Sequence, residues 1–500
     1  MRLVTDAASE RPDAPALIYR DRDISYGELA EWVRRAGAGL ASLGVGKGDR
    51  VALLVGNVPE FVYALYGALS LGAVVAPLNV QLTPEEVGYI LADAQAKVVV
   101  AEIGLLPTVL AVRDRVASIE HVLVVGPPPT PRGTESFDGL IDAATGGPPD
   151  AEVSEDDLAV LAYTAGTTAN PKAAMLTHGN LLANLGQVRE VEALRQTPGD
   201  VVLLALPLFH IYGLNAVLNV SLMEGATALL LERFDPAQSL DQVARHRVTV
   251  LVGAPPMFQA WLAVPGEPDL SSVRMAVSGA APLPAEILDA FRKRYGVTIW
   301  EGYGLTEAAP VVTTNALGEE PKGGSIGIPL PGLDVHLLDE DGEDAVDGDP
   351  GEIVVSGPNV FQGYRDRPEE TAAVLRDGRL HTGDVAYRDQ DGFLFLVDRK
   401  KDLVIVSGFN VFPKEVEEAI LANPKVAEAA VVGVPDERTG EAVKAFVVSR
   451  EPVTVDEILD HCSARLARFK VPRHVEVVDE LPKHVTGKVL RRELRREEPS

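Results

Sequence analysis

The sequence is poor in cysteine, because Cys462 is the single one among 500 residues. An intrachain disulfide bond is therefore excluded, and a reduced, cytoplasmic setting is expected. Cys462 stands in a helical pattern, so we interpret it as a packed side chain and not as a nucleophile. Residues 1–13 lack the apolar stretch of a signal peptide. No uninterrupted apolar run reaches about 18 residues, so no membrane span is expected.

Positive charge is also scarce. The chain has 46 Lys and Arg against 73 Asp and Glu, which gives a net charge of −27. This excess of negative charge argues against nucleic acid as a partner, because phosphate backbones select basic surfaces. It does not exclude ATP, which needs only a local positive site, and it leaves weak contact with a membrane surface open. The sequence does not choose between a monomer and a homodimer.

Strand and helix signals alternate over the first 400 residues. Short apolar runs typical of buried strands occur at residues 50–55, 73–77, 97–101, 121–125, 201–206, 227–231, 249–253, 274–277 and 297–300. Helical patterns lie between them, and two begin with the capping boxes Ser25–Glu28 and Thr83–Glu86. Apolar strands separated by helices predict largely parallel, buried sheets, so we expect an α/β fold.

The pattern changes after residue 353. Residues 353–396 carry short strand signals with Gly and Asp turns, which predict a small barrel, and residues 398–402 form a dense charge cluster. A compact unit then follows, with helices expected at 413–421 and 455–469 and strands at 427–433, 442–448 and 474–478. We therefore predict a large N-terminal domain over residues 1–400 and a small, mobile α+β lid domain over residues 401–500.

The segment from Tyr163 to Lys172 is a candidate polyphosphate site. It reads Tyr-Thr-Ala-Gly-Thr-Thr-Ala-Asn-Pro-Lys, with a predicted strand (158–163) before it and a predicted helix (178–188) after it. Backbone N–H groups and hydroxyls can donate to phosphate oxygens, and the lysine adds a positive charge. The spacing is not that of a Walker A loop. An exposed Thr-rich turn is the alternative interpretation.

Six further motifs follow in order. They are Leu-Pro-Leu-Phe-His-Ile-Tyr-Gly (206–213), Ser-Gly-Ala-Ala-Pro-Leu (278–283), Glu-Gly-Tyr-Gly-Leu-Thr-Glu (301–307), His-Thr-Gly-Asp (381–384), Asp-Arg-Lys-Lys-Asp (398–402) with Ser-Gly-Phe-Asn (407–410), and Pro-Lys-His-Val-Thr-Gly-Lys (482–488). Together the motifs resemble the adenylate-forming superfamily of acyl-CoA synthetases, adenylation domains and luciferases. The resemblance covers essentially the whole chain and is strongest to bacterial fatty-acyl-CoA ligases and 4-coumarate-CoA-ligase-like enzymes.

The resemblance implies two half-reactions. A carboxylate attacks the α-phosphate of ATP to give an acyl-adenylate and pyrophosphate, and CoA then displaces AMP to give a thioester. ATP and Mg²⁺ are the implied cofactors, and CoA is a co-substrate. The N-terminal domain would bind AMP and the acid, and the lid would carry the catalytic lysine. We expect no carrier-protein domain after residue 500 and therefore no multimodular peptide synthetase, but an enzyme that loads a separate carrier protein remains an alternative.

The resemblance also assigns roles to residues. Lys488, Thr168, Glu307 and His210 would be catalytic: Lys488 would enter the site for adenylation, and Glu307 with Thr168 would hold Mg²⁺. His210 would gate the carboxylate end of the acid pocket. The residues implied in nucleotide and CoA binding are Thr164, Gly166, Thr167, Thr168, Lys172, Gly279, Ala280, Ala281, Glu301, Gly302, Tyr303, Gly304, Thr306, Asp384, Arg399, Lys401, Gly408, Phe409 and Lys488.

Some of these roles are specific. Tyr303 would stack on adenine, Asp384 would accept from the ribose hydroxyls, and Arg399 would reach the ribose or a phosphate. Lys401 matches the hinge about which the lid would turn. Gly408 and Phe409 would line the pantetheine tunnel.

The phosphate segment departs from the usual family sequence. Ala165, Ala169 and Ala173 stand where most members have a serine and two glycines. If position 169 requires a positive φ, alanine there costs about 1 kcal/mol. A nucleotide-binding relative with impaired catalysis is therefore the non-enzymatic alternative.

The acid pocket is expected to be apolar. Residues 211–214, 254–258, Gly302 and 308–312 should line it, and Gly302 offers no charge for a second carboxylate. Each buried CH₂ group contributes about 0.8 kcal/mol, so a deep apolar pocket favours longer acids over acetate. We rank a medium- to long-chain fatty acid first and an aryl or cinnamic acid second.

Overall fold

The computed structural model describes residues 3–20, 22–164, 171–339, 341–399, 404–406, 409–436, 438–466, 468–483 and 489–494. The chain divides into two compact units, which are described separately. Unit 1 consists of Met1–Gly323, Pro329–Asp334 and Ser356–Gly378, and unit 2 of Gly324–Ile328, Val335–Val355 and Arg379–Ser500. The domain boundary predicted at residue 400 falls inside unit 2 and stays a prediction.

The larger sheet includes, within unit 1, strands in the order β15-β14-β13-β12-β10-β11-β1-β2. Its strands are β1 (Pro15–Tyr19), β2 (Arg22–Ser25), β10 (Val201–Leu204), β11 (Thr227–Leu230), β12 (Val250–Gly253), β13 (Met275–Ser278), β14 (Ile299–Gly304) and β15 (Val311–Thr314). The pairs from β14 through β1 are parallel, whereas β1/β2 and β14/β15 are antiparallel. The predicted α/β fold with parallel, buried strands is confirmed.

The second sheet of unit 1 has the order β7-β6-β5-β3-β4-β8-β9. Its strands are β3 (Arg50–Leu54), β4 (Val74–Pro77), β5 (Val98–Glu102), β6 (His121–Val125), β7 (Glu135–Ser136), β8 (Leu158–Thr164) and β9 (Lys172–Thr177). The neighbours are parallel except for β8/β9. Buried side chains of the helices that follow β4 and β5, such as Val87, Leu91 and Val109, pack with Val99 and Ala101 of this sheet.

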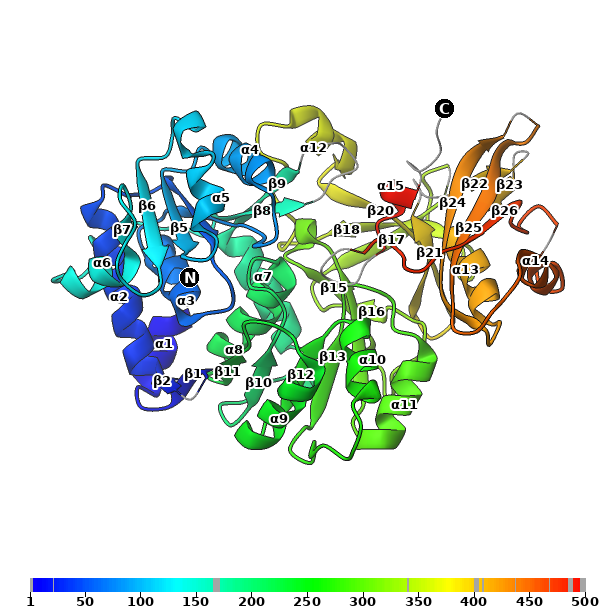
Figure 1. The fold of residues 1–500 in the computed structure, drawn as a ribbon, viewed down its shortest axis with the longest axis horizontal. Helices are drawn as coiled ribbons and strands as arrows, with labels where there is room; N and C mark the ends of the chain where they lie inside the picture. The colour runs from blue at the N-terminus through cyan, green and yellow to red at the C-terminus, as the bar shows by residue number, and fades with distance from the viewer. Residues whose placement is uncertain are drawn as a thin grey trace. The chain divides into compact units, whose positions relative to one another are not determined.

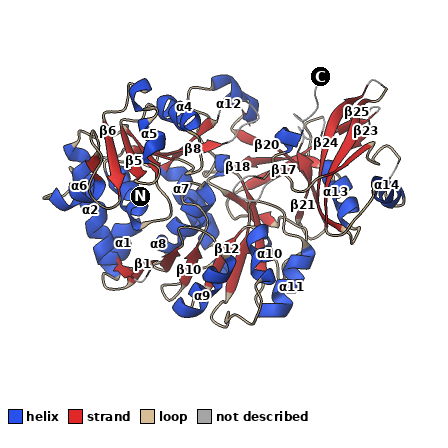
Figure 2. Cartoon of the chain, viewed as in Figure 1, coloured by secondary structure: helices blue, strands red, loops and turns tan. Residues whose placement is uncertain are grey.

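Helices connect these strands, as Figure 2 shows by colour. They are α1 (Leu3–Glu10), α2 (Tyr26–Ser42), α3 (Pro59–Ser70), α4 (Pro84–Ala94), α5 (Leu106–Leu110), α6 (Phe137–Ala143), α7 (His178–Arg189), α8 (Val220–Met223), α9 (Pro236–His246), α10 (Pro255–Ala263), α11 (Ala285–Tyr295) and α12 (Pro368–Val374). Shorter turns of helix are η1 (Arg113–Arg115), η2 (Glu192–Leu194), η4 (Thr306–Ala308) and η5 (Asn315–Leu317), and η3 (Tyr212–Asn219) is a π-helix. Helix α10 packs on both α9 and α11, beside β12 and β13 (Figure 1).

Both predicted capping boxes of unit 1 are present. The Ser25 hydroxyl accepts from the Glu28 N–H while the Glu28 carboxylate accepts from the Ser25 N–H, and the same exchange joins Thr83 and Glu86. Each satisfies N–H groups that the first turn of a helix otherwise leaves unbonded. These local signals fix where α2 and α4 begin.

Unit 2 contains two antiparallel arrangements of strands. One includes β17 (Asp334–Leu338), β18 (Gly351–Ser356), β20 (Arg379–Arg388) and β21 (Leu394–Arg399); the other has β22 (Val404–Val406), β23 (Phe409–Val411), β24 (Val426–Asp436) and β25 (Gly440–Ser449), with β26 (His474–Val477) parallel to β25. The helices are α13 (Pro413–Leu421), α14 (Val455–Ser463) and α15 (Arg491–Leu494), and the remaining short strands of the chain are β16 (Ile328–Pro329) and β19 (Leu375–Arg376). Cys462 is fully buried in the core of this unit, as predicted.

The helix predicted at residues 178–188 is confirmed as α7. The sequence analysis missed strand β9, which pairs with β8 and separates the phosphate segment from that helix. One predicted element differs in length. Helix α14 ends at Ser463 and not at residue 469. Leu466 and Phe469 still pack on the core, but they reach it from beyond the helix. Within the described part of the chain, none of the helices is long and apolar enough to cross a bilayer.

Candidate active site

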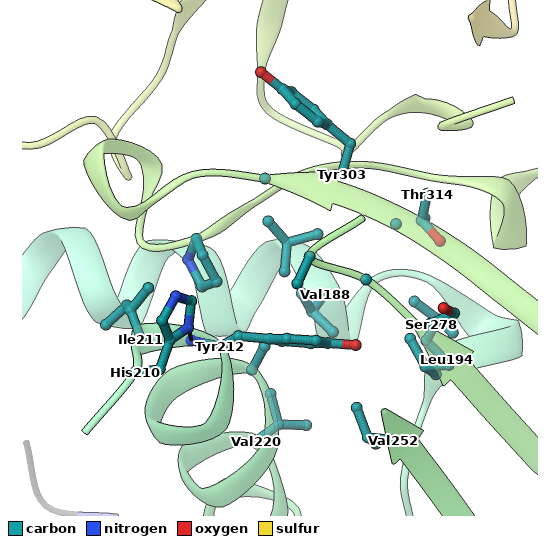
Figure 3. Close-up of a pocket in the computed structure, with 18 of the residues that line it drawn as sticks. Val188, Leu194, His210, Ile211, Tyr212, Val220, Val252, Ser278, Tyr303 and Thr314 are labelled. Carbon is teal, nitrogen blue, oxygen red and sulfur yellow. Dashed lines mark hydrogen bonds between the residues drawn. The ribbon is translucent and has the colours of Figure 1, made fainter. Parts of the chain in front are cut away.

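An apolar cavity of about 100 Å³ lies in unit 1 between strands β12–β14 and the segment that carries η3. It is lined by Val188, Leu194, Gln196, His210, Ile211, Tyr212, Ala216, Val220, Val250, Val252, Met275, Val277, Ser278, Gly279, Ala280, Gly302, Tyr303, Gly304, Leu305, Thr306, Pro310, Val311 and Thr314. His210 and Ile211 lie at one end, and Leu194 and Ser278 lie at the other (Figure 3). Several residues of three predicted motifs therefore meet at this cavity.

Tyr212 spans part of this cavity. It is the first residue of the π-helix η3, a form of helix that is frequent at functional sites. Its hydroxyl donates to the carbonyl oxygen of Gly253 at 3.3 Å, and burial raises its pKa. A Cβ atom at Gly279 would lie 3.0 Å from Cζ of Tyr212, so glycine allows the end of β13 to approach the ring. The predicted nucleotide residue Gly279 thus forms part of the wall beside the ring.

His210 lies just before η3 and borders the cavity. The backbone N–H of Tyr212 donates to its Nδ1 atom at 3.2 Å. Because Nδ1 is the acceptor, a neutral imidazole carries its proton on Nε2. The ring can therefore act as a hydrogen-bond donor through Nε2.

The loop after β13 contains Ala280 and Ala281. Ala280 has φ of +72°, a left-handed conformation that costs a residue with a Cβ atom about 1 kcal/mol or more. The carboxylate of Glu301, which is 2% exposed, accepts from the N–H of Leu283 at 3.0 Å and so ties the loop to β14. Glu301 does not line the cavity. Its observed contact is with the loop that carries the predicted nucleotide residues.

The end of β14 forms a second wall. Gly302 pairs with Thr314 and Tyr303 pairs with Thr313, which fixes both residues on the antiparallel partner β15. A Cβ atom at Gly304 would lie 2.1 Å from the carbonyl oxygen of Pro310, so only glycine fits there. The motif therefore contains at least one glycine that the backbone geometry demands.

Glu307 and Lys172 both contact one tyrosine, Tyr364. The hydroxyl of Tyr364 donates to Oε1 of Glu307 at 2.6 Å, and Nζ of Lys172 lies 5.2 Å from the centre of the Tyr364 ring. Burial, and then the nearby Glu307 carboxylate, raise the pKa of Tyr364, so the phenol stays a proton donor. Nζ of Lys172 also lies 4.0 Å from Oε1 of Glu370. The sequence analysis missed Tyr364, because none of the seven motifs contains it.

The surroundings of Glu307 fit a magnesium ion. Mg²⁺ usually takes one or two carboxylates and completes its coordination with phosphate oxygens and water. No cluster of three or more Asp, Glu, His or Cys that could hold a metal occurs among the described residues, so a site made by protein groups alone does not fit them. A single carboxylate such as Glu307 suits a metal that arrives with a nucleotide.

The strands that flank the phosphate segment bring Thr164 and Lys172 together. These two residues face each other across the β8/β9 pair. Ala173 is the next residue of β9, where the backbone is extended and a Cβ atom causes no left-handed strain. The predicted residues Gly166, Thr167 and Thr168, and the substituted positions Ala165 and Ala169, lie outside the described residues.

In unit 2 the structure pairs Asp384 of β20 with Arg399 of β21. Asp384 is 6% exposed, and its N–H donates to the Thr382 hydroxyl at 3.1 Å. The two residues predicted to hold the ribose are therefore neighbours in this sheet. Phe409 pairs with Val406 in β23 and β22. Lys401, Gly408 and Lys488 lie outside the described residues.

The walls of the cavity differ in part from the predicted ones. Residues 254–258 do not line it, because they begin α10 and Phe258 packs on Trp261 and Phe291 instead. Strands β12 and β13 and the segment around η2 supply much of the wall in their place. These positions carry no motif, so only the folded structure identifies them.

The matches to known families agree with this arrangement. Residues 4–365 match the AMP-binding enzyme family, and residues 415–488 match the AMP-binding enzyme C-terminal domain. A long-chain-fatty-acid–CoA ligase of Bacillus subtilis (strain 168) is 38% identical over 526 aligned positions, covering 99% of this chain and 94% of the relative. A feruloyl-CoA synthase of an Amycolatopsis species is 41% identical over 490 aligned positions, covering 97% and 96%.

Solved structures show the same fold. The crystal structure of an anthranilate CoA ligase in complex with anthranoyl-AMP superposes with a TM-score of 0.91 at 30% identity, covering 99% of this chain and 96% of that one. The chain belongs to the AMP-binding enzyme family. It is an AMP-forming acid–thiol ligase that uses ATP and CoA.

Proposed function

We propose that this protein activates a carboxylic acid with an apolar body and transfers it to CoA through an acyl-adenylate. The observation that most supports this proposal is the apolar cavity, whose walls are the ends of the strands that carry the nucleotide motifs. An acid held there lies beside the predicted adenine residues Gly279 and Tyr303. The proposal rests on that proximity, because nucleotidyl transfer depends mainly on positioning and charge neutralisation.

The described residues support separate tasks in this reaction. His210 can donate from Nε2 to a carboxylate oxygen, since Nδ1 is already occupied by the Tyr212 N–H. Glu307 would hold Mg²⁺ with Thr168, and the ion would neutralise charge on the phosphates. Lys172 would add charge beside them, while Lys488 of the C-terminal lid would act at the α-phosphate. Asp384 and Arg399 would hold the ribose, and Lys401 would serve as the hinge.

The kind of acid is proposed from the lining of the cavity and from the identity of the relatives. A medium- to long-chain fatty acid is the first candidate, since the cavity wall is largely aliphatic and long-chain-fatty-acid–CoA ligases are among the relatives. An aryl or cinnamic acid is the second. A feruloyl-CoA synthase is a relative of similar rank, and an anthranilate CoA ligase shares the fold. A cytoplasmic location stays a prediction of the sequence.

The test is pyrophosphate release by the full-length protein with Mg-ATP, CoA and a panel of acids from acetate to palmitate together with cinnamates. Mass spectrometry would identify the acyl-CoA. We expect release with acids that fit an apolar cavity and little with acetate. Binding of ATP without release for any acid would contradict the proposal. It would support the alternative of a relative disabled at Ala165 and Ala169.

A further inference from the structure

The apolar cavity holds two polar atoms that the protein leaves unsatisfied. Ser278 is fully buried and Gln196 is 5% exposed, and both line the cavity. The Ser278 hydroxyl and Oε1 of Gln196 have no hydrogen-bond partner among the described residues. Buried polar atoms are nearly always hydrogen-bonded, so two such atoms in one apolar cavity call for an explanation.

Other polar groups of the same wall are satisfied by the protein. The Tyr212 hydroxyl donates to Gly253, and the Thr314 hydroxyl donates to the carbonyl oxygen of Glu301 at 3.2 Å and accepts from the N–H of Ala316 at 3.2 Å. The contrast indicates that the fold does not supply partners for Ser278 and Gln196. It leaves those partners to whatever fills the cavity.

The position of Ser278 indicates which part of a bound acid would meet it. Ser278 and Leu194, which precedes Gln196 by two residues, lie at the end of the cavity opposite His210 (Figure 3). If the carboxylate lies near His210, as proposed above, the tail of the acid points toward Ser278. A saturated hydrocarbon tail would leave both polar atoms unpaired.

We propose that this end of the cavity is a polar subsite that selects an aromatic acid carrying a hydroxyl group on the ring, at the end remote from the carboxylate. A hydroxyl group both donates and accepts, so it can donate to Oε1 of Gln196 or accept from the Ser278 hydroxyl. The surrounding valine and leucine side chains suit the flat apolar face of a ring. This inference rests on the proposed function, and for the same site it favours the second candidate acid, an aromatic one, over the fatty acid that was ranked first.

The test compares two stable adenylate mimics, the sulfamoyl-adenosine derivatives of 4-hydroxycinnamate and 4-methylcinnamate. The hydroxyl and methyl groups are similar in size and differ in hydrogen bonding. We expect calorimetry on the full-length protein to show about tenfold tighter binding of the hydroxyl compound, the effect of about one hydrogen bond. S278A and Q196M should each reduce this ratio to about threefold or less.

S272A is the matched control. The Ser272 hydroxyl donates to the Val248 carbonyl oxygen at 2.8 Å and does not line the cavity, so the ratio should not change. Equal binding of the two compounds by the unmodified protein would refute the polar subsite. An unchanged ratio of the two affinities in both S278A and Q196M would refute it as well. Equal binding would also indicate that ordered water satisfies the two atoms. The binding experiment needs no turnover. Absence of pyrophosphate release would therefore contradict the proposed function, whereas the polar subsite would still be decided by calorimetry.

Discussion

Tyr364 contacts both charged groups of the proposed phosphate site, one through its hydroxyl and the other through its ring. It donates to Glu307, and its ring lies beneath the Lys172 ammonium group. Replacing Tyr364 by Phe keeps the ring and removes the donor. We expect pyrophosphate release to slow by about 10- to 150-fold, since a hydrogen bond to a charged group contributes about 1.5–3 kcal/mol. Steady-state kinetics should show this loss in kcat, with KM for the acid unchanged.

Tyr295→Phe is the comparison for that variant. The Tyr295 hydroxyl donates to the carbonyl oxygen of Trp261 at 2.9 Å, away from the cavity. The Tyr295→Phe variant should therefore release pyrophosphate at the unchanged rate. If both variants lose the same activity, the effect of Tyr364→Phe is a general loss of packing, and its role in placing Glu307 is refuted.

His178 gives a pH dependence of stability. It begins α7 and is 2% exposed, and burial lowers its pKa from 6.5 to about 4. Because the folded pKa lies below the unfolded one, acidification through this range charges the unfolded chain first and destabilises the fold. Between pH 7 and pH 5 the free energy of unfolding should fall by about 2 kcal/mol from this residue.

Urea denaturation of wild type and His178→Leu at both pH values would measure that effect. Stability should fall less between pH 7 and pH 5 in the variant, whatever its stability at pH 7. Parallel curves for the two proteins would show that His178 is not the group that titrates.

At the scale of single elements, replacing either of two helical glycines by alanine should change the free energy of unfolding, in opposite directions for the two positions. Gly186 in α7 has open space where a Cβ atom would go, whereas a Cβ atom at Gly67 in α3 would lie 2.8 Å from the Ala36 Cβ atom. Gly186→Ala should raise the free energy of unfolding by about 0.5–1 kcal/mol through helix propensity. Gly67→Ala should lower it by about 1–3 kcal/mol because α2 and α3 must separate. Urea midpoints test both, and a shift in the same direction would refute the argument.

The sequence predicted the first residues of helices best, because a capping box involves only residues that are close together in the sequence. The hydroxyl of Thr83 and the carboxylate of Glu86 lie three residues apart and need nothing else from the fold to begin α4. Strand β9 was missed because its existence depends on pairing with β8, and its first residues, such as Ala173 and Ala174, have weak strand propensity. The end of α14 was placed too late because Leu466 and Phe469 keep a helical spacing outside a helix.

In the candidate site, only residues that belong to a sequence motif could be predicted. His210, Gly302 and Tyr303, which the motifs had singled out, line the cavity. Gln196 and Tyr364 have no local signal, because they reach the site from segments that only the tertiary fold brings close. The roles assigned to the named site residues stay predictions.

At the scale of the whole molecule, Lys488 is proposed to act in one half-reaction only. Lys488→Ala should slow adenylate formation by about 100- to 1000-fold, since a cation at the α-phosphate stabilises developing charge. Thioester formation from a supplied acyl-adenylate should persist, because the lysine is proposed to leave the site for that step. Pyrophosphate release and CoA acylation, measured separately, would show this split.

Lys483→Ala is the matched control, since Nζ of Lys483 lies 2.6 Å from Oε2 of Glu428 in a partly exposed ion pair that contributes little. It should change neither half-reaction. Equal losses in both half-reactions for Lys488→Ala would contradict a lid that changes position between them.

Strand β13 ends at Ser278, and Gly279 and Ala280 follow directly, so one short stretch of backbone borders both the tail end of the cavity and the start of the nucleotide loop. Glu301 then fastens that loop to β14. Directed evolution of acid preference would therefore meet a built-in trade-off at Ser278, where new acids come with altered ATP use. Val188 and Leu194 also line the cavity but belong neither to β13 nor to the nucleotide loop. Libraries at these two positions should change acid preference and leave ATP use alone, so they are the better starting point for re-engineering this ligase.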